Sequence, residues 1–194
     1  TKIAAVEALE RPTTLNNGHG EHNIQGIGDM HIPFIHNVMN TDVVIGVSDR
    51  VTDSLNLLFG SDVGRKYLQG RQKLDSKLVA AFADVGISGF ANIVASIKLA
   101  KQLHYGPDDV IVTVATDSAS LYDSERDSYR AKHFSSFDEV NAGEIFGSCL
   151  ASVATDNVVE LTDQLRRQVF NLGYYTWVEQ QGVSVGDFER RRHP

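Results

Sequence analysis

Three short runs of apolar and β-branched residues stand out along the chain, at residues 2–8, 42–48 and 110–115. Each run is nearly continuous in apolar character instead of alternating with polar positions. This pattern is typical of strands in a parallel sheet that is buried on both faces. We therefore predict an α/β fold with an open, mostly parallel sheet and helices on both faces.

The strongest helical pattern covers residues 89–105, where apolar residues recur at helical spacing on one face. Ser88 is the expected N-cap, and Gly106 followed by Pro107 is the expected stop signal. Other expected helices cover residues 51–59 behind a Ser48-Asp49 cap, 62–68, 75–83, 137–154, 161–171 and 185–192. Because the chain is mostly helical after Thr116, we predict an α/β portion at residues 1–122 and a helical C-terminal extension at 123–194.

Composition narrows the possible partners. The 194 residues are 42% hydrophobic, enough for a globular core, and their formal net charge is −7. A negative chain lacks the basic face that nucleic acid or an anionic membrane requires, so neither partner is expected. The single cysteine, Cys149, excludes an internal disulfide framework, and no apolar run approaches the roughly 18 residues of a membrane span. A cytoplasmic location is expected.

The segment from residue 18 to residue 36 contains four of the seven histidines. Imidazole and carboxylate groups are ligands of zinc and iron, which keeps a metal-dependent hydrolase open as an alternative. No helix-borne His-Glu-x-x-His spacing occurs, however, and glycines interrupt any regular scaffold. We expect hydrogen-bonded loop histidines and no metal site. The residues concerned are His19, His22, His31, His36, Glu21 and Asp29.

Glycines suggest two further features of the chain. Gly26 and Gly28 flank Ile27, and they either let the backbone approach a flat ligand closely or form an ordinary tight turn. Residues 86–89 lead into the predicted helix, whose free N–H groups form a natural anion site, although a simple helix cap is favoured there. Both alternatives stay open on the residues alone.

A third candidate site follows the predicted strand at 110–115. Thr116, Asp117 and Ser118 lie where a parallel sheet presents its carboxyl edge, the usual position of ligands in open α/β sheets. A hydroxyl there can bond to a heterocyclic ring nitrogen. Capping of the next helix is the simpler interpretation of these residues.

The order of these features resembles a known family. Asn23-Ile24-Gln25-Gly26-Ile27-Gly28, then Gly86-Ile87-Ser88, then Thr116-Asp117-Ser118 after a strand are similar to motifs in the second half of the cysteine synthase and cystathionine β-synthase family. These are pyridoxal-phosphate (PLP) enzymes of fold type II. The resemblance covers roughly residues 2–122. It departs from the family pattern at Thr116, where the family has proline, and at Gly89 and Phe90.

The resemblance implies a PLP site. The hydroxyl of Ser118 would meet the pyridine nitrogen, and a neutral hydroxyl leaves that nitrogen unprotonated, which suits β-elimination or β-replacement. If Asp117 faced the nitrogen instead, it would hold a proton there and strengthen the electron sink. The cofactor-binding residues implied by the resemblance are Gln25, Gly26, Ile27, Gly28, Thr116, Asp117 and Ser118.

In the family, the Schiff-base lysine, the substrate-carboxylate loop and the glycine-rich phosphate cradle precede the segment that begins here at Thr1. No catalytic residue is therefore predicted in this chain, which should be inactive without the missing N-terminal half. The resemblance implies a homodimer and an amino-acid substrate such as O-acetylserine, serine or cysteine. The main alternative is a non-catalytic α/β domain that binds an anion at the Gly26 and Ser88 loops.

Overall fold

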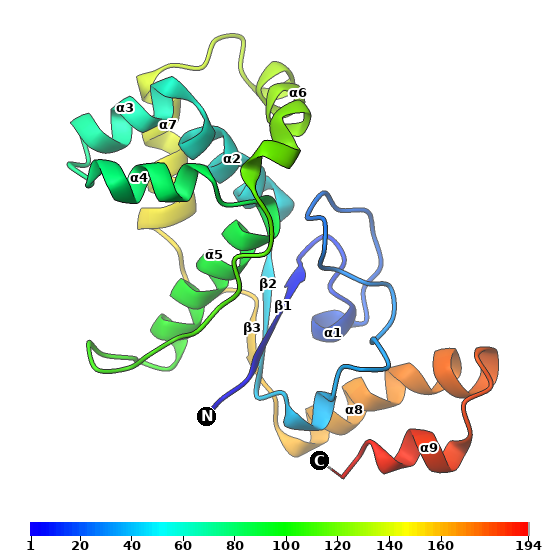
Figure 1. Cartoon of the computed structure of the whole chain (residues 1–194). Coiled ribbons are helices and arrows are strands. Elements are labelled where there is room, and N and C mark those ends of the chain that lie inside the picture. The colour runs from blue at the N-terminus through cyan, green and yellow to red at the C-terminus, as the bar shows by residue number, and fades with distance from the viewer. Residues whose placement is uncertain (194) are drawn as a thin grey trace.

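A computed structural model describes residues 1–193 and contains a three-stranded sheet in the order β1-β2-β3 (Figure 1). Strand β1 (Ala4–Ala8) pairs in parallel with β2 (Val43–Val47), which confirms the first two predicted strands. Strand β3 (Val158–Glu160) pairs with β2 in the antiparallel sense. The α/β class is confirmed, but the sheet is mixed, with one parallel and one antiparallel pair.

The prediction of a third strand at residues 110–115 is wrong. Residues 110–115 belong to no strand, and the side chains of Val110, Val112 and Val114 are 82%, 89% and 65% exposed. The third strand is instead β3, which the sequence analysis missed because only Val158 and Val159 carry an apolar signal. A run of β-branched residues forms a strand only when a neighbouring backbone is available to pair with it.

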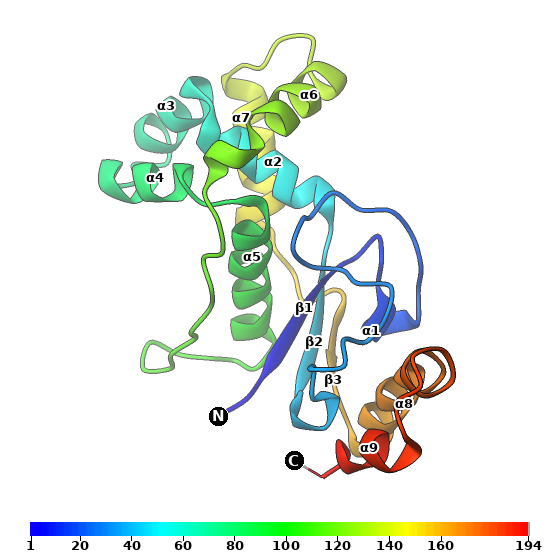
Figure 2. The same cartoon turned by 45° about the vertical axis from the view of Figure 1, so that its right-hand side comes forward.

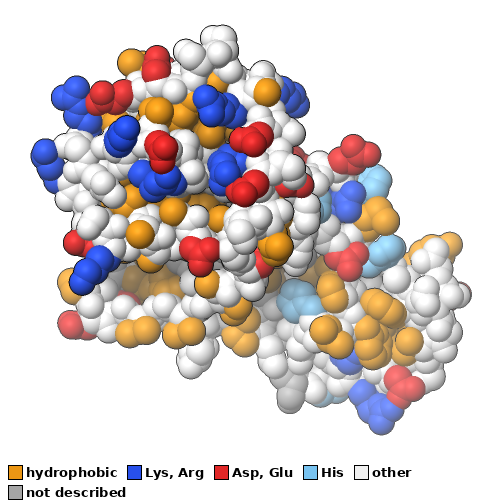
Figure 3. Space-filling model, turned by 45° about the horizontal axis from the view of Figure 1, so that its top comes forward, with side chains coloured by type: hydrophobic (Ala, Val, Ile, Leu, Met, Phe, Trp, Pro, Cys, Tyr) orange, Lys and Arg blue, Asp and Glu red, His pale blue; other side chains and the backbone are white. Residues whose placement is uncertain are grey.

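Helices cover both faces of the sheet, as predicted (Figures 1 and 2). Helix α5 packs on one face, and α1 lies on the other. Helices α3, α4, α6 and α7 gather around α2 beyond the end of β2, and charged side chains of both signs cover this end (Figure 3). The helices are α1 (Thr13–Asn16), α2 (Asp49–Gly60), α3 (Asp62–Gly70), α4 (Ser76–Ala83), α5 (Ile87–Gln102), α6 (Asp123–His133), α7 (Glu139–Phe146), α8 (Asp163–Tyr174) and α9 (Val185–Arg190).

Local capping explains most helix starts. The Oγ of Ser48 accepts a hydrogen bond from Arg50 N at the start of α2, as predicted. At the start of α7, Asp138 and Asn141 form a reciprocal capping box. The expected Ser88 cap is wrong, because α5 begins at Ile87 and the hydroxyl of Ser88 bonds elsewhere.

The core joins the sheet to helices from both parts of the chain. Buried residues of β2, α2 and α5 form one cluster, and this cluster also includes Phe137, Ala142, Ile145 and the free Cys149. The division into residues 1–122 and 123–194 stays a prediction, although the second segment supplies β3 and part of the core. Among residues 1–193, every helix is too short or too polar to cross a bilayer.

Candidate functional site

Residues of all three predicted motifs lie close together at the start of α5. Ser88 is 2% exposed, and its Oγ lies 2.5 Å from Oγ1 of Thr116. Gly26 has a φ of +88°, and a Cβ built there would lie 3.9 Å from the Ser88 Oγ. Ser88 is therefore bonded to the segment that follows residue 115 and lies close to Gly26.

Asp117 organises this junction through its backbone carbonyl and its carboxylate. Gly86 N donates to Asp117 O at 3.0 Å, and Thr116 Oγ1 donates to Asp117 Oδ1 at 2.9 Å. The hydroxyl of Tyr122 donates to Asp117 Oδ2. Burial, followed by this bond to Asp117, raises the pKa of Tyr122 to about 12. The sequence offered no signal for Tyr122, because a tyrosine five residues from an aspartate belongs to no motif considered above.

These bonds set the direction of hydrogen bonding. A hydroxyl has one proton, and Thr116 gives its proton to Asp117, so Ser88 must be the donor toward Thr116. The remaining lone pairs of Ser88 are then free to accept a hydrogen bond. The buried serine thus offers an acceptor beside the backbone of Gly26.

Ser118 bonds to a different group of residues. Its Oγ donates to Asp84 Oδ1 at 2.6 Å and accepts from Ser120 N at 3.3 Å. It thereby caps η2, a 3₁₀-helix at Ala119–Tyr122. The structure makes no bond between Ser118 and the pair formed by Ser88 and Thr116, so a contact between Ser118 and a cofactor stays a prediction.

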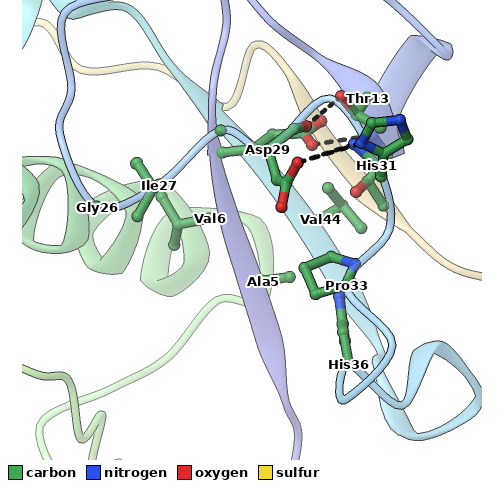
Figure 4. A pocket seen from close by; sticks show the side chains of 13 residues that line it. Ala5, Val6, Thr13, Gly26, Ile27, Asp29, His31, Pro33, His36 and Val44 are labelled. Atoms are coloured by element: carbon green, nitrogen blue, oxygen red, sulfur yellow. Dashed lines mark hydrogen bonds and ion pairs between the residues drawn. The ribbon is translucent and has the colours of Figure 1, made fainter.

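The Gly26 loop also borders a hollow of about 490 Å³ (Figure 4). Figure 4 shows the loop passing across β1, with Asp29 and His31 on the far side of that strand from Gly26. Gly28 has a φ of +86°, and a Cβ there would come within 2.5 Å of His22 Nε2, so only glycine fits. Of the other predicted residues, Ile27 is half-buried and lines the hollow, and Gln25 is exposed.

The histidines of this region bond to separate partners. His22 Nε2 lies 3.0 Å from Gly28 O, His36 Nε2 lies 2.9 Å from Thr41 Oγ1, and His31 Nδ1 lies 3.6 Å from Asp29 Oδ1. Burial lowers the pKa of His36. Across residues 1–193, no three histidine, cysteine or acidic side chains are placed so that they could hold a metal ion.

A second polar cluster connects Asn23, just before the Gly26 loop, to α2 by hydrogen bonds. Asn23 N donates to Asp49 Oδ2 at 3.1 Å, and Asn23 Nδ2 donates to Asp53 Oδ1 at 3.1 Å. Ser48 Oγ and Asp49 N both donate to the carboxylate of Glu10. Burial, with Asp49 and Glu10 nearby, raises the pKa of Asp53 to about 6, and burial also raises the pKa of Asp49. The sequence analysis did not identify this cluster, because its members are distant in sequence.

The raised pKa of Asp53 predicts a pH-dependent stability. Between about pH 4 and pH 6 the folded state binds a proton that the unfolded state has lost, so stability falls as pH rises through this window. We expect the free energy of unfolding to fall by roughly 2 kcal/mol, after allowance for solvent screening. Urea unfolding from pH 4 to pH 8 measures this change.

Asp53→Asn should remove most of this pH-dependent decrease in the free energy of unfolding, and the variant should be more stable than the original chain at pH 7. Asp127→Asn, at an exposed position on α6, is the matched control and should leave the decrease unchanged. An Asp53→Asn variant whose stability falls through the same window as much as that of the original chain would contradict the assignment to Asp53.

The comparison with known proteins agrees with the family resemblance. Cysteine synthase B of Campylobacter jejuni subsp. jejuni serotype O:2 (strain ATCC 700819 / NCTC 11168) is 34% identical to this chain over 120 residues. These residues make up 62% of the chain but only 33% of the relative, so the match spans about a third of that protein's length. No family model matches the chain. The resemblance to the cysteine synthase family predicted from the sequence is thus confirmed: the chain is similar to part of a cysteine synthase.

Proposed function

We propose that this chain is part of a PLP-dependent enzyme that catalyses β-replacement or β-elimination on an amino acid such as O-acetylserine, serine or cysteine. The observation that carries the proposal is the similarity to cysteine synthase B together with the junction at Ser88. There Ser88 bonds to Thr116 and lies close to Gly26, and the family resemblance assigns Gly26 and Thr116, from separate motifs, to the cofactor site.

The residues at the junction fit a flat, polar ring. Gly26 has no Cβ, and a Cβ there would meet only the Ser88 Oγ within 4 Å, so the backbone is open to close approach. Ser88 offers an acceptor, and Asp117 is held by Thr116 and Tyr122. When bound, PLP supplies an electron sink for charge that develops next to the substrate amino group.

Ser118 has a more specific proposed role at the ring nitrogen. In the structure Ser118 gives its hydroxyl proton to Asp84. To donate to an unprotonated ring nitrogen, Ser118 must exchange Asp84 for the cofactor as its acceptor. A protonated nitrogen could instead donate to Ser118 while the bond to Asp84 persists.

The Schiff-base lysine and the phosphate cradle belong, in this proposal, to a polypeptide segment outside the 194 residues. Lys98 and Lys101 lie on α5, with Lys98 ten residues and about 15 Å along the helix from Ser88. Lys98 Nζ is bonded to Asp156 O at 2.7 Å, and Lys101 Nζ donates to Val153 O. Both amines thus have partners on the segment before β3. We propose that this chain alone is inactive and that the complete enzyme is a homodimer.

The anion-binding alternative is less well supported. At the start of α5, Gly86 N already donates to Asp117 O, and a Cβ at Gly86 would come within 2.1 Å of Asp117 Oδ1. The helix N-terminus therefore already has a carboxylate of the chain beside it. A second anion would have to displace Asp117 or overcome repulsion from it.

An activity assay tests the proposal. The protein is purified as the product of its natural gene, supplied with PLP, and given O-acetylserine with sulfide, or serine or cysteine alone. We expect formation of cysteine in the first case or pyruvate in the others, with loss of product when PLP is removed. The proposal would be contradicted if none of the three substrates gave cysteine or pyruvate.

Variants of the same protein test the site. Ser118→Ala should weaken PLP binding about tenfold, the effect of one lost hydrogen bond to a bound group. Ser184→Ala, at the N-cap of α9, should leave PLP binding unchanged. Equal effects of the two substitutions would remove Ser118 from the site.

A further inference from the structure

The C-terminal helices bond to the loop that precedes β2. These helices are α8, the π-helix η4 (Tyr175–Gln180) and α9. Figures 1 and 2 show α8 and α9 side by side, next to the chain that leads into β2. The indole N–H of Trp177 donates to Ile32 O at 2.7 Å, and Arg191 Nη2 donates to His36 O at 3.1 Å. The backbone of the loop is thus held at two points by the C-terminal helices.

Aromatic packing reinforces these two hydrogen bonds. The ring of Trp177 packs on Phe34, with 5.3 Å between the ring centroids. The guanidinium carbon of Arg191 lies 4.4 Å from the centre of the Phe34 ring. It also lies 5.5 Å from the ring centres of Phe170 on α8 and Phe188 on α9. One side chain of the loop, Phe34, therefore contacts both residues that donate to the loop backbone.

Residues 25–31 form a mostly exposed stretch between two buried isoleucines. Ile24 is 0% exposed and belongs to the main core. Ile32 is 3% exposed and packs in a separate small cluster with Val38 and with Val169 of α8. Within the described residues, the backbone groups of 25–31 form no hydrogen bond with another backbone group. One end of the stretch is therefore fixed by the main core and the other by the C-terminal helices.

Two side chains bond to the middle of the stretch. His22 Nε2 lies 3.0 Å from Gly28 O, and Thr13 Oγ1 donates to Asp29 O at 2.7 Å. Both side chains belong to the chain before the stretch. Among the described residues, the hydrogen bonds that join residues 30–37 to helices or strands are the two from η4 and α9. The far end of the stretch thus depends on the C-terminal helices for its attachment.

We propose that Trp177 and Arg191 are positioning residues for Gly26. They hold the far end of residues 25–31, so that the Gly26 backbone stays beside Ser88. Glycines with positive φ at both sides of residue 27 allow the backbone to change its dihedral angles when this end is released. The importance of Gly26 for PLP rests on the proposed function, whereas the attachment of the stretch does not. The C-terminal helices would in this way act on the site without contacting a ligand.

Limited proteolysis of the protein without PLP tests the positioning directly. Thermolysin cleaves before apolar residues, and the stretch contains Ile27 and Met30, of which Met30 is 51% exposed. Cleavage requires local opening, so its rate follows the population of the open form. Trp177→Phe keeps a ring against Phe34 but removes the N–H donor. We expect it to speed cleavage within residues 25–31 about fivefold, the effect of one lost hydrogen bond. Mass spectrometry of the fragments locates the cuts.

Matched variants on the same helices make the test specific. Tyr175→Phe changes a 65% exposed residue of η4 and should leave cleavage unchanged. Arg191→Met keeps an apolar side chain but removes the bond to His36 O, so it should also speed cleavage about fivefold. Arg190→Met removes an ion pair with Asp187 inside α9 and should have no effect on the stretch.

PLP affinity and a second cleavage region distinguish positioning from a general loss of stability. In the product of the natural gene, Trp177→Phe should bind PLP about fivefold more weakly, because the same displacement of the stretch opposes binding. Tyr175→Phe should bind PLP as the original protein does. Cleavage within the exposed residues 110–115 should keep its original rate in both variants.

Three outcomes would overturn the inference. The first is equal cleavage of residues 25–31 in Trp177→Phe and Tyr175→Phe. The second is a Trp177→Phe variant in which cleavage of residues 110–115 rises equally, which would indicate general destabilisation. The third is a Trp177→Phe variant that binds PLP as tightly as the original protein. If the original protein bound no PLP, the proposed function would be contradicted, and the cleavage rates alone would decide whether Trp177 positions the stretch.

Discussion

Gly86→Ala is expected to separate the segment 116–118 from the start of α5. An alanine Cβ would come within 2.1 Å of Asp117 Oδ1 and 2.9 Å of the backbone Asp117 O. The Asp117 side chain cannot simply turn away, because Thr116 and Tyr122 donate hydrogen bonds to its two carboxylate oxygens. We expect a loss of about 2–3 kcal/mol in the free energy of unfolding, typical of overpacking at a buried contact.

Denaturant unfolding measures this loss, and hydrogen exchange at residues 116–122 shows where it arises. Gly147→Ala is the control, because a Cβ at Gly147 meets nothing within 4 Å. It should change stability by less than about 1 kcal/mol. If Gly86→Ala were as stable as the Gly147→Ala control, the close contact between Gly86 and Asp117 would be contradicted.

Gly64→Ala should have the largest effect on the fold itself. A Cβ on this α3 residue would lie 1.8 Å from Leu58 O and 2.7 Å from Leu58 C, both backbone atoms of α2. Helices α2 and α3 would have to move apart at a fully buried position. We expect a loss of about 3–5 kcal/mol, which removes much of the stability of an average domain.

Gly70→Ala supplies a control in the same helix, because a Cβ at Gly70 meets nothing within 4 Å. Alanine has a higher helix propensity than glycine, so this variant should gain up to about 1 kcal/mol. Thermal and urea unfolding compare the two variants directly. Equal stabilities of Gly64→Ala and Gly70→Ala would show that α2 and α3 do not pack as described.

Features determined by neighbouring residues were predicted correctly from the sequence. Helix α2 follows its predicted Ser48 cap, α3 begins at the predicted residue 62, and the first two strands follow buried apolar runs. Residues 110–115 carry the same type of apolar run, yet they have no ladder partner within the described chain. Strand formation depends on a non-local neighbour, so composition alone does not reveal its absence.

The candidate site also combines residues that local motifs predict with residues whose roles depend on contacts in the fold. Gly26 and Thr116 were identified from local motifs, but their proximity appears only in the fold, where the buried Ser88 hydroxyl bonds to Thr116 and lies close to Gly26. Because Ser88 opens a helix, its sequence context indicates a cap. The roles of Tyr122 and Asp53 arise only from tertiary contacts with Asp117 and Asn23.

Borohydride trapping tests the central claim most directly. The protein is purified as the product of its natural gene, incubated with PLP, reduced with borohydride, digested and examined by peptide mass spectrometry. The proposed function predicts a pyridoxyl group on one lysine that precedes Thr1, and no such group on the seven lysines of these 194 residues. An adduct on Lys98 or another lysine of this chain would contradict the proposed position of the catalytic amine, and the absence of any adduct would contradict the PLP site itself.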